Sequence, residues 1–355
     1  MVGLSRRTIL GLPGFAGLLQ AAAESPAERA KQMVMSLRSA QKAPGMAAAV
    51  WKQGSFVWSG AFGEADLEDA AAVSTKTRFR IGSLSKLLTT AAAARLYDRG
   101  LLDLDAPVQQ YLPSFPVKSG RITARLLLGH LAGVRHYGRS EYLNRQHYDS
   151  VAETLKTIED APLLHEPGTK YFYSSYGFNL LGAMLEKAGS LDFRQLIRRE
   201  VCDPLRLAST TADDNEQIIE GRARFYSLSA TEQAVNSPYT DLSDRWPSGG
   251  FLSTAEDLAR FGGAHLTGDF LREETRRMMF TSQKTVGGSE TGTGLGWRTG
   301  MIAKRRIYHH GGDAIGGRAF LLVRPDDMMS VALLANLTFA KFAETQAVAL
   351  GDVIG

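Results

Sequence analysis

The sequence contains little that could tie the chain together covalently or anchor it in a membrane. Cys202 is the single cysteine among 355 residues, so neither an intramolecular disulfide nor a metal site built from several cysteines can form. No stretch reaches the roughly 18 apolar residues that a membrane-spanning helix needs. Long blocks of like charge are also missing, and the formal net charge is +4. These absences argue against a disulfide scaffold, a transmembrane anchor and a nucleic-acid partner.

What remains is the composition of an ordinary globular chain. Hydrophobic residues make up 44% and charged residues 22%, with 36 glycines and 12 prolines. These values exclude a disordered chain, a collagen-like repeat and a coiled coil. At roughly 100 to 200 residues per domain, the length allows two or three domains or one large interrupted domain.

The first 23 residues are typical of an export signal rather than of a folded domain. Arg6-Arg7 precedes a short apolar run at 9–19, and Ala21-Ala22-Ala23 supplies the small residues that signal peptidases accept. The paired arginines predict the twin-arginine route, which exports folded proteins. We therefore expect a signal peptide at 1–23, cleavage near Ala23, and a periplasmic mature domain at 24–355. The alternative is a frayed N-terminal helix with chance arginines.

Strand-like segments lie near both ends of the mature chain. Apolar, β-prone runs at 46–51 and 56–62 predict a hairpin, and further strands are expected at 305–310, 318–323 and 329–336. Helical patterns occupy most of the chain between these two groups.

Apolar residues at helical spacing predict helices at 26–40, 83–99, 178–188 and 340–353. Ser253-Thr254-Ala255-Glu256 is interpreted as a capping box that opens another helix.

This order of elements predicts an α+β fold. One antiparallel sheet is built from both chain ends and flanked by helices, and a mainly helical region is inserted between its two halves. The α/β part is expected at about 24–82 and 250–355, and the helical part at about 83–249.

Ser83-Leu84-Ser85-Lys86 opens the most regular of the predicted helices. Side chains three residues apart share a helix face, so the Ser83 hydroxyl and the Lys86 amine can meet. A serine becomes a nucleophile when a neighbouring base takes its proton, and burial can lower the pKa of a lysine enough to make it that base. Backbone N–H groups in the first helical turn would favour a developing anion.

The alternative interpretation of Ser83 is a plain helix N-cap. The chain also contains a second Ser-x-x-Lys, Ser39-Ala40-Gln41-Lys42, at the polar end of a predicted helix. We interpret this second match as a chance occurrence, because no apolar stripe follows it to bury the lysine.

Two further segments place polar groups at turns. Tyr173-Ser174-Ser175 lies just before an apolar helix, and His310-Gly311-Gly312 ends a predicted strand, where glycines let a substrate approach the backbone closely. The remaining histidines lack the His-Glu-x-x-His and His-x-His spacings of zinc sites, so no metal site and no cofactor is predicted. Structural roles are preferred for His130, His136, His147, His165 and His265.

In chain order, these three segments resemble the Ser-x-x-Lys, Tyr-x-Asn and Lys/His-x-Gly motifs of the class C β-lactamase and penicillin-binding-protein superfamily of serine hydrolases. The resemblance covers roughly residues 30–350 and includes Phe79-Arg80-Ile81-Gly82. Within the superfamily, Gly133-Val134-Arg135-His136-Tyr137 is most similar to the serine β-lactamase-like protein of mitochondria and its bacterial relatives. The resemblance implies a β-lactamase/transpeptidase-like fold.

Carried over position by position, the resemblance implies an acyl-serine mechanism. Ser83 would attack a carbonyl, while Lys86 and Tyr173 would share the general-base and general-acid work. The backbone N–H groups of Ser83 and Asp313 would hold the oxyanion.

The resemblance also implies that Ser175, His310, Gly311 and Gly312 bind the substrate. His310 stands where many relatives have a lysine that faces the substrate's carboxylate, and an ordinary imidazole there would change its charge near pH 6.5. Ser175 replaces the usual Asn, whose amide both donates and accepts hydrogen bonds. Efficient β-lactam hydrolysis is therefore less expected than nucleophilic catalysis itself.

We therefore expect an exported serine hydrolase that acts on a peptide-like amide or ester, with a small molecule or a peptide as its substrate. One alternative is an esterase or transacylase that uses the same site. Another is a scaffold that binds peptidoglycan-like peptides without turning them over.

Overall fold

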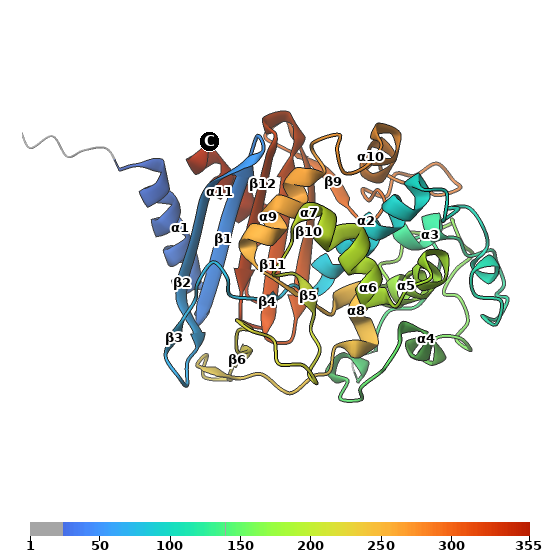
Figure 1. Cartoon of the computed structure of the whole chain (residues 1–355), viewed down its shortest axis with the longest axis horizontal. Helices are drawn as coiled ribbons and strands as arrows, with labels where there is room; N and C mark the ends of the chain where they lie inside the picture. Colours follow the sequence, from blue (N-terminus) through green and yellow to red (C-terminus); the bar gives the residue numbers. More distant parts are fainter. Residues whose placement is uncertain (1–23, 139) are drawn as a thin grey trace, which may run out of the picture.

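The computed structural model describes residues 24–138 and 140–355, and Figure 1 shows how their elements are arranged. The expected signal peptide at 1–23 lies outside the described residues. Within the described residues, no helix is long and apolar enough to cross a membrane.

The main sheet draws its strands from both ends of the chain. Its members are β1 (Gly45–Lys52), β2 (Ser55–Asp66), β3 (Ala71–Ala72), β9 (Arg298–Ile302), β10 (Arg305–Ala314), β11 (Gly317–Arg324) and β12 (Met329–Ala335). They pair in the order β3-β2-β1-β12-β11-β10-β9, and every pairing is antiparallel. The two halves join where β1 pairs with β12, from Met46 opposite Ala335 to Lys52 opposite Met329. This arrangement confirms the predicted α+β fold class.

Two smaller sheets accompany the main one. The first contains β4 (Phe79–Arg80), β8 (Phe251–Ser253) and β5 (Thr211–Ala212) in that spatial order, and the second contains β6 (Tyr226–Leu228) and β7 (Ala234–Asn236). β4 and β8 flank the proposed boundaries of the helical region in the chain, and their pairing closes that region at its base.

The helices fall into two groups on either side of the main sheet (Figure 1). Their bounds are α1 (Pro26–Ala40), α2 (Ser85–Asp98), α3 (Ala124–Leu128), α4 (Val151–Thr154), α5 (Ser175–Gly189), α6 (Phe193–Ile197), α7 (Asp203–Leu205), α8 (Trp246–Gly249), α9 (Ala255–Ala264), α10 (Glu273–Phe280) and α11 (Glu344–Ile354). α1 and α11 cover one face, and α9 with the helical region covers the other.

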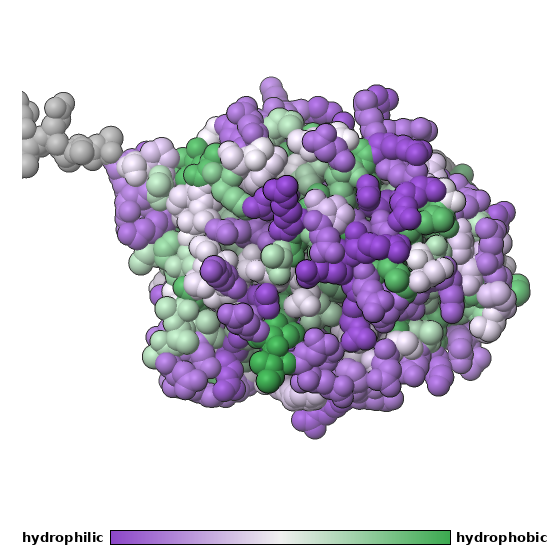
Figure 2. Space-filling model, in the orientation of Figure 1, coloured by the Kyte–Doolittle hydropathy of each residue, from purple (hydrophilic) through white to green (hydrophobic). Residues whose placement is uncertain are grey.

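Both faces of the central strands are buried, which explains their almost continuous apolar sequence. In β1, Met46, Ala48 and Val50 belong to the core beneath α1 and α11, whereas Ala47 and Ala49 belong to the larger core beneath α9 and α2. Successive side chains of a strand point to opposite faces, so a strand covered on both sides needs apolar residues at every position. Hydrophilic side chains cover most of the outer surface in the view of Figure 2.

Three details differ from the sequence-based expectation. α9 is capped by Thr254, whose hydroxyl accepts from the Asp257 N–H at 3.1 Å, so the cap lies one residue later than predicted. β10 does not end at Gly312 but continues to Ala314, because the glycines keep their pairing with β11. The last helix begins at Glu344 rather than at residue 340, because Ala343 is extended.

The turn that carries Ser83 lies directly against β10. A Cβ added to Gly312 would lie 1.9 Å from the Ile81 carbonyl oxygen, and one added to Gly82 would lie 2.5 Å from the Asp313 carbonyl oxygen. Gly82 also has a φ of +50°, which few other residues adopt. Both glycines are therefore needed for the helical region to approach the sheet this closely.

This contact predicts a destabilised Gly312→Ala variant. The added methyl group meets a backbone oxygen that cannot rotate away, so we expect a loss of about 1–3 kcal/mol in the free energy of unfolding, measured by urea denaturation. Gly300→Ala in the edge strand β9 is the matched control, because its Cβ would lie 3.7 Å from Ile307, an ordinary contact. Equal unfolding midpoints for the two variants would contradict the close approach.

Candidate active site

Ser83 lies in a short 3-10 turn (Gly82–Leu84) that leads into α2, at the wall of a cavity of about 390 Å³. The sequence placed this residue in the first turn of the helix itself, which begins instead at Ser85. The cavity lies between the helical region and the edge of the main sheet. Its walls include Ser83, His136, Tyr137, Tyr173, Ser175, Arg245, Ser248, Arg298, His310, Gly311 and Asp313.

Lys86 is fully buried one helical turn after Ser83. Its Nζ lies 3.3 Å from the Ser83 Oγ, and it donates to the Ser175 hydroxyl at 2.9 Å and to the Ser248 carbonyl at 2.6 Å. Within the described residues, no carboxylate lies within 4.0 Å of this amine. Burial, helped by the positive charge of Arg245, holds the pKa of Lys86 well below its ordinary value of 10.5. Burial therefore favours the neutral amine, which is the form that can accept a proton.

Tyr173 also lies beside the Lys86 amine. Its ring centroid is 4.9 Å from the Lys86 Nζ. Burial raises the pKa of the Tyr173 phenol above its ordinary value, and a hydrogen bond with Ser83 opposes that rise without cancelling it. At neutral pH the phenol thus keeps its proton, whereas burial favours the neutral form of the Lys86 amine. The structure brings Ser83, Lys86 and Tyr173 together from two of the three motif segments, and their catalytic roles stay a prediction.

Two histidines that the sequence analysis treated as structural hold the backbone that follows Tyr173. The Ser174 N–H donates to His130 Nδ1 at 3.2 Å, and the Ser175 N–H donates to His136 Nδ1 at 3.1 Å. Their rings pack against that of Tyr173, with centroids 4.4 and 5.7 Å away.

In both imidazoles, Nδ1 must carry no proton in order to accept these hydrogen bonds. Burial lowers the pKa of His136 to about 4 and that of His130 well below 6.5, which is consistent with this role. No sequence motif reveals it, because both histidines lie some forty residues before Tyr173 and meet it through folding.

Asp313 closes the cavity from the sheet side. Its backbone nitrogen lies 2.8 Å from the position of an added Gly82 Cβ, so it adjoins the turn that carries Ser83. Its carboxylate turns to Arg318, which donates to it at 2.7 Å. The backbone of Asp313 therefore faces the turn, while its side chain is held elsewhere; its assignment as an oxyanion donor stays a prediction.

His310 lines the cavity, but its charge differs from the sequence-based expectation. The side chain is 3% exposed, and Nδ1 lies 2.6 Å from the Gly311 carbonyl oxygen, to which it can only donate. Burial, helped by the positive charge of Arg298, lowers the pKa of His310 to about 3. Because the imidazole is neutral near pH 7, His310 cannot supply the pH-dependent positive charge that we expected near a substrate carboxylate.

Arg298 is a cation of the cavity that the sequence analysis missed. The two other cavity arginines are already paired, Arg245 with Asp244 at 2.6 Å and Arg318 with Asp313 at 2.7 Å. In the part of the chain that the structure describes, no carboxylate lies within 4.0 Å of Arg298. It begins β9 beside β10, a place that only the sheet pairing reveals.

Aromatic side chains form the remaining wall. The Tyr137 hydroxyl is hydrogen-bonded to the Ser248 hydroxyl at 2.6 Å, and the Arg245 guanidinium lies 4.7 Å from the Tyr137 ring centroid. Tyr142 continues this wall and stacks on Phe339, with centroids 6.2 Å apart. The Ser39–Lys42 match, by contrast, is exposed on and after α1, and Lys42 pairs with Glu232.

Comparisons with known proteins agree with this geometry. The Beta-lactamase family model matches residues 22–353. The human mitochondrial serine beta-lactamase-like protein LACTB is 30% identical over 396 residues, which cover 85% of this chain and 72% of that protein.

Two solved structures share the fold. The octameric penicillin-binding protein homologue from Pyrococcus abyssi superposes with a TM-score of 0.80 and 23% identity. The match covers 92% of this chain and 77% of the Pyrococcus abyssi chain. EstCE1 is described as a hydrolase with promiscuous acyltransferase activity. It superposes with a TM-score of 0.79 and 22% identity, and the match covers 93% of this chain and 98% of the EstCE1 chain. By its sequence and its fold, the chain belongs to the beta-lactamase family of serine hydrolases.

Proposed function

We propose that this protein hydrolyses a peptide-like amide or ester through an acyl-enzyme on Ser83. The observation that carries the proposal is the fully buried Lys86 amine, 3.3 Å from the Ser83 hydroxyl and without a carboxylate partner in the described residues. A charged amine in that place would be costly, so the neutral base is favoured.

The hydrogen bonds of Lys86 support its role as the general base. A neutral amine has two N–H donors and one lone pair. The Ser175 hydroxyl and the Ser248 carbonyl accept the two donors, which leaves the lone pair for the Ser83 proton. Ser83 Oγ then attacks the substrate carbonyl carbon while its proton moves to Lys86.

Tyr173 completes the proton transfer. Its phenol keeps its proton near neutral pH, so it can relay a proton from Lys86 to the leaving group as the bond to the carbonyl carbon breaks. A water molecule then adds to the acyl carbon, releases the carboxylic acid and returns the serine hydroxyl. In both halves of the reaction the N–H groups of Ser83 and Asp313 would stabilise the oxyanion, with about 3 kcal/mol from each such donor.

The cavity supports a substrate with an anionic group. Arg298 offers a guanidinium with no carboxylate partner in the described chain, and His310 offers a neutral imidazole beside it. Gly311 leaves room for the substrate backbone along β10, and Ser175 contributes a hydroxyl. Gly312, expected from the sequence to bind substrate, faces the Ile81 carbonyl instead of the cavity. We propose that Arg298, rather than His310, meets a substrate carboxylate.

An esterase or transacylase is the second candidate. Ser175 cannot grip a substrate amide with both a donor and an acceptor as Asn can, and its hydroxyl is already engaged by Lys86 at 2.9 Å. The structural similarity to EstCE1, described as a hydrolase with promiscuous acyltransferase activity, favours the same candidate. Esters need less activation of the leaving group than amides, so an esterase or transacylase reaction requires less proton transfer to the leaving group at this site.

The first test is the Ser83→Ala variant. We expect turnover of any accepted ester or amide to fall by about 1,000-fold or more, and labelling by a broad serine-reactive fluorophosphonate to disappear. Ser39→Ala is the matched control, since it removes the serine of the exposed Ser-x-x-Lys. Equal turnover by folded Ser83→Ala and the wild type would refute the mechanism, and binding without turnover by the wild type would favour a non-catalytic scaffold.

The second test concerns the pH dependence of kcat/KM. Lys86 acts only when deprotonated, so activity should fall on the acid side as pH drops through its lowered pKa. Arg245 helps to lower that pKa, so Arg245→Gln should raise it and move the acid limb to higher pH. Arg222→Gln, which removes a cation outside the cavity, should leave the limb in place. An acid limb that Arg245→Gln leaves unchanged, or shifts downward, would contradict this assignment.

We also propose that the chain is exported to the periplasm by the twin-arginine route. Support comes from the Arg6-Arg7 pair and the alanines at 21–23. Replacing both arginines by lysine should trap the full-length precursor inside the cell, because the route recognises the guanidinium pair rather than charge alone. Cell fractionation would detect this, and a mature chain of the variant that begins at Glu24 outside the inner membrane would instead indicate general secretion.

A further inference from the structure

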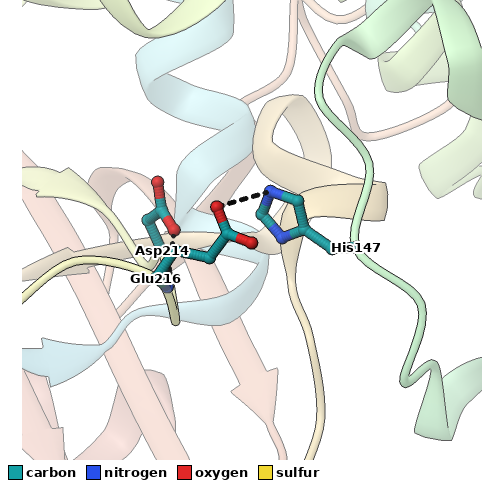
Figure 3. A group of neighbouring side chains, drawn as sticks. All are labelled: His147, Asp214 and Glu216. Atoms are coloured by element: carbon teal, nitrogen blue, oxygen red, sulfur yellow. Dashed lines mark hydrogen bonds and ion pairs between the residues drawn. The ribbon is translucent and has the colours of Figure 1, made fainter.

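A histidine and two carboxylates from separate loops converge outside the catalytic cavity. His147 comes from the loop before α4, while Asp214 and Glu216 come from the loop after β5 (Figure 3). One potential ligand atom from each residue lies within 4.8 Å of the other two. The hydrolytic mechanism uses none of these side chains.

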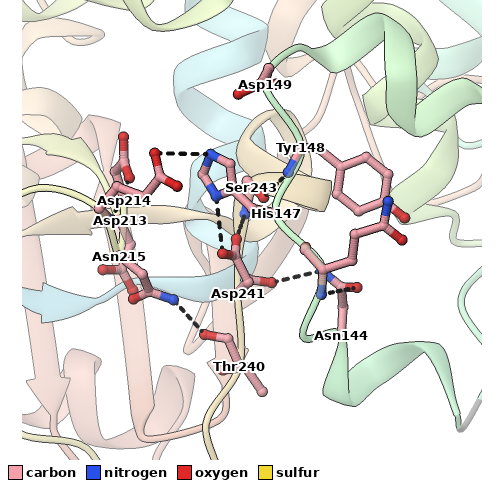
Figure 4. Close-up of polar contacts among 12 residues, drawn as sticks. Asn144, His147, Tyr148, Asp149, Asp213, Asp214, Asn215, Thr240, Asp241 and Ser243 are labelled. Carbon is pink, nitrogen blue, oxygen red and sulfur yellow. Dashed lines mark hydrogen bonds and ion pairs between the residues drawn. The ribbon is translucent and has the colours of Figure 1, made fainter.

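A fourth residue fixes the orientation of the imidazole. Asp241 is 3% exposed, and its Oδ2 lies 3.0 Å from His147 Nδ1 (Figure 4). Its other oxygen accepts from the Ser243 N–H at 2.9 Å, which holds the carboxylate in place. When Nδ1 donates to Asp241, the lone pair of the neutral imidazole lies on Nε2 and is directed at Glu216, 3.9 Å away. Histidines that bind metal ions are commonly oriented by a carboxylate in this way.

The carboxylates near His147 exceed the cations that could balance them. Glu216 and Asp241 have no lysine or arginine within 4.0 Å in the described chain, and both pair with His147, which is a cation only when protonated. Arg194 is shared between Asp214 at 3.2 Å and Asp192 at 3.3 Å. The nearby arginines Arg80 and Arg222 are both engaged by Asp213.

This excess of negative charge favours a bound cation. One divalent ion bound to His147 Nε2 would take the place of the second imidazole proton and balance the charges of both Glu216 and Asp241. Arg194 opposes such an ion through its contact with Asp214, but it also leaves that carboxylate only partly neutralised, because its guanidinium serves two acids.

The distances suit an ion after a small adjustment. Three atoms that lie within 4.8 Å of one another enclose a point no more than about 2.8 Å from each, against roughly 2.0–2.2 Å for Zn²⁺ bound to nitrogen or oxygen. The side chain of Glu216 is 72% exposed and can rotate inward. Asp214 is held more firmly, since Gln217 and Arg194 both donate to its Oδ2.

We propose that His147, Asp214 and Glu216 bind a divalent transition-metal ion of the zinc type, with Asp241 as the carboxylate that orients His147. One imidazole nitrogen and two carboxylate oxygens suit such an ion. The ion would join two loops that are far apart in the chain, so its role is to stabilise the fold beside the cavity rather than to take part in hydrolysis. The proposal does not depend on the proposed reaction.

The test is a titration of the metal-stripped, full-length protein with Zn²⁺ in an isothermal calorimeter. We expect saturable binding of one ion per chain and a higher unfolding temperature with Zn²⁺. His147→Gln and Glu216→Gln should abolish the binding, and Asp241→Asn should weaken it by about 10- to 100-fold, as for other residues that orient a metal ligand. His165→Gln and Glu274→Gln, which lie outside the cluster, should bind like the wild type.

A fluorescence measurement tests whether the ion binds at this cluster. The Trp246 ring lies 6.4 Å from the His147 ring, so Co²⁺ bound at the cluster should quench Trp246 fluorescence in the wild type and not in Glu216→Gln. Glu216 is exposed, so that variant should fold even if His147→Gln does not. Absence of saturable Zn²⁺ binding by the wild type, or unchanged binding by folded Glu216→Gln, would overturn the proposal and leave the cluster as an ion-pair network.

Discussion

The burial of the Lys86 amine without a balancing charge is the constraint on which the rest of the site depends. A buried ammonium is costly unless a carboxylate meets it, and none lies within 4.0 Å in the described chain, so the neutral amine is favoured. The neighbouring groups fit this state, because Ser175 and Ser248 offer neutral oxygens. His130, His136 and His310 all have lowered pKa values for the same reason, namely burial among groups that are neutral or positive. The groups around the Lys86 amine are thus buried and largely uncharged, and the charged side chains lie at the cavity walls. In such surroundings, fixed dipoles act on a developing oxyanion more strongly than they would in water.

The two parts of the fold make different contributions to this site. The helical region supplies the groups that move protons, because α2 carries Lys86 and the start of α5 follows Tyr173. The sheet supplies the surface along which a substrate can lie, because β10 carries His310 to Asp313. Gly82 and Gly312 let these two parts meet at backbone distance, so the nucleophile and the strand are positioned by main-chain contacts rather than by flexible side chains. This explains why the reacting groups can be neutral and still well ordered.

The sequence predicted the elements with strong periodicity and the residues within short motifs. The helix at 26–40 and the hairpin in β1 and β2 follow from local patterns, and the Ser83–Lys86 pair follows from helical spacing.

The cap of α9 was misplaced by one residue because Ser253 and Thr254 are equally suitable caps in the sequence. Arg298 was missed because it reaches the site from a distant segment. Structural roles were expected for His130 and His136, but their contacts with the backbone after Tyr173 could not be predicted for the same reason. The charge of His310 was wrong because its pKa depends on burial, which no short motif records. The His147 cluster was missed for a related reason, since its residues have no fixed spacing in the chain.

The pairing of β1 with β12 has a consequence for the order of events during synthesis. β1 is synthesised long before its partner β12, since Met46 pairs with Ala335. One edge of β1 therefore stays unpaired while the residues between β1 and β12 are synthesised. Pairings between such distant segments are slow to form, since a long loop must close first. Exposed strand edges of this kind promote aggregation, so a chaperone that shields the nascent N-terminal hairpin would raise the yield of folded protein. A chain that stops before β12 would contain every residue from Ser83 to Asp313 and still lack the strand that joins the two halves of its sheet.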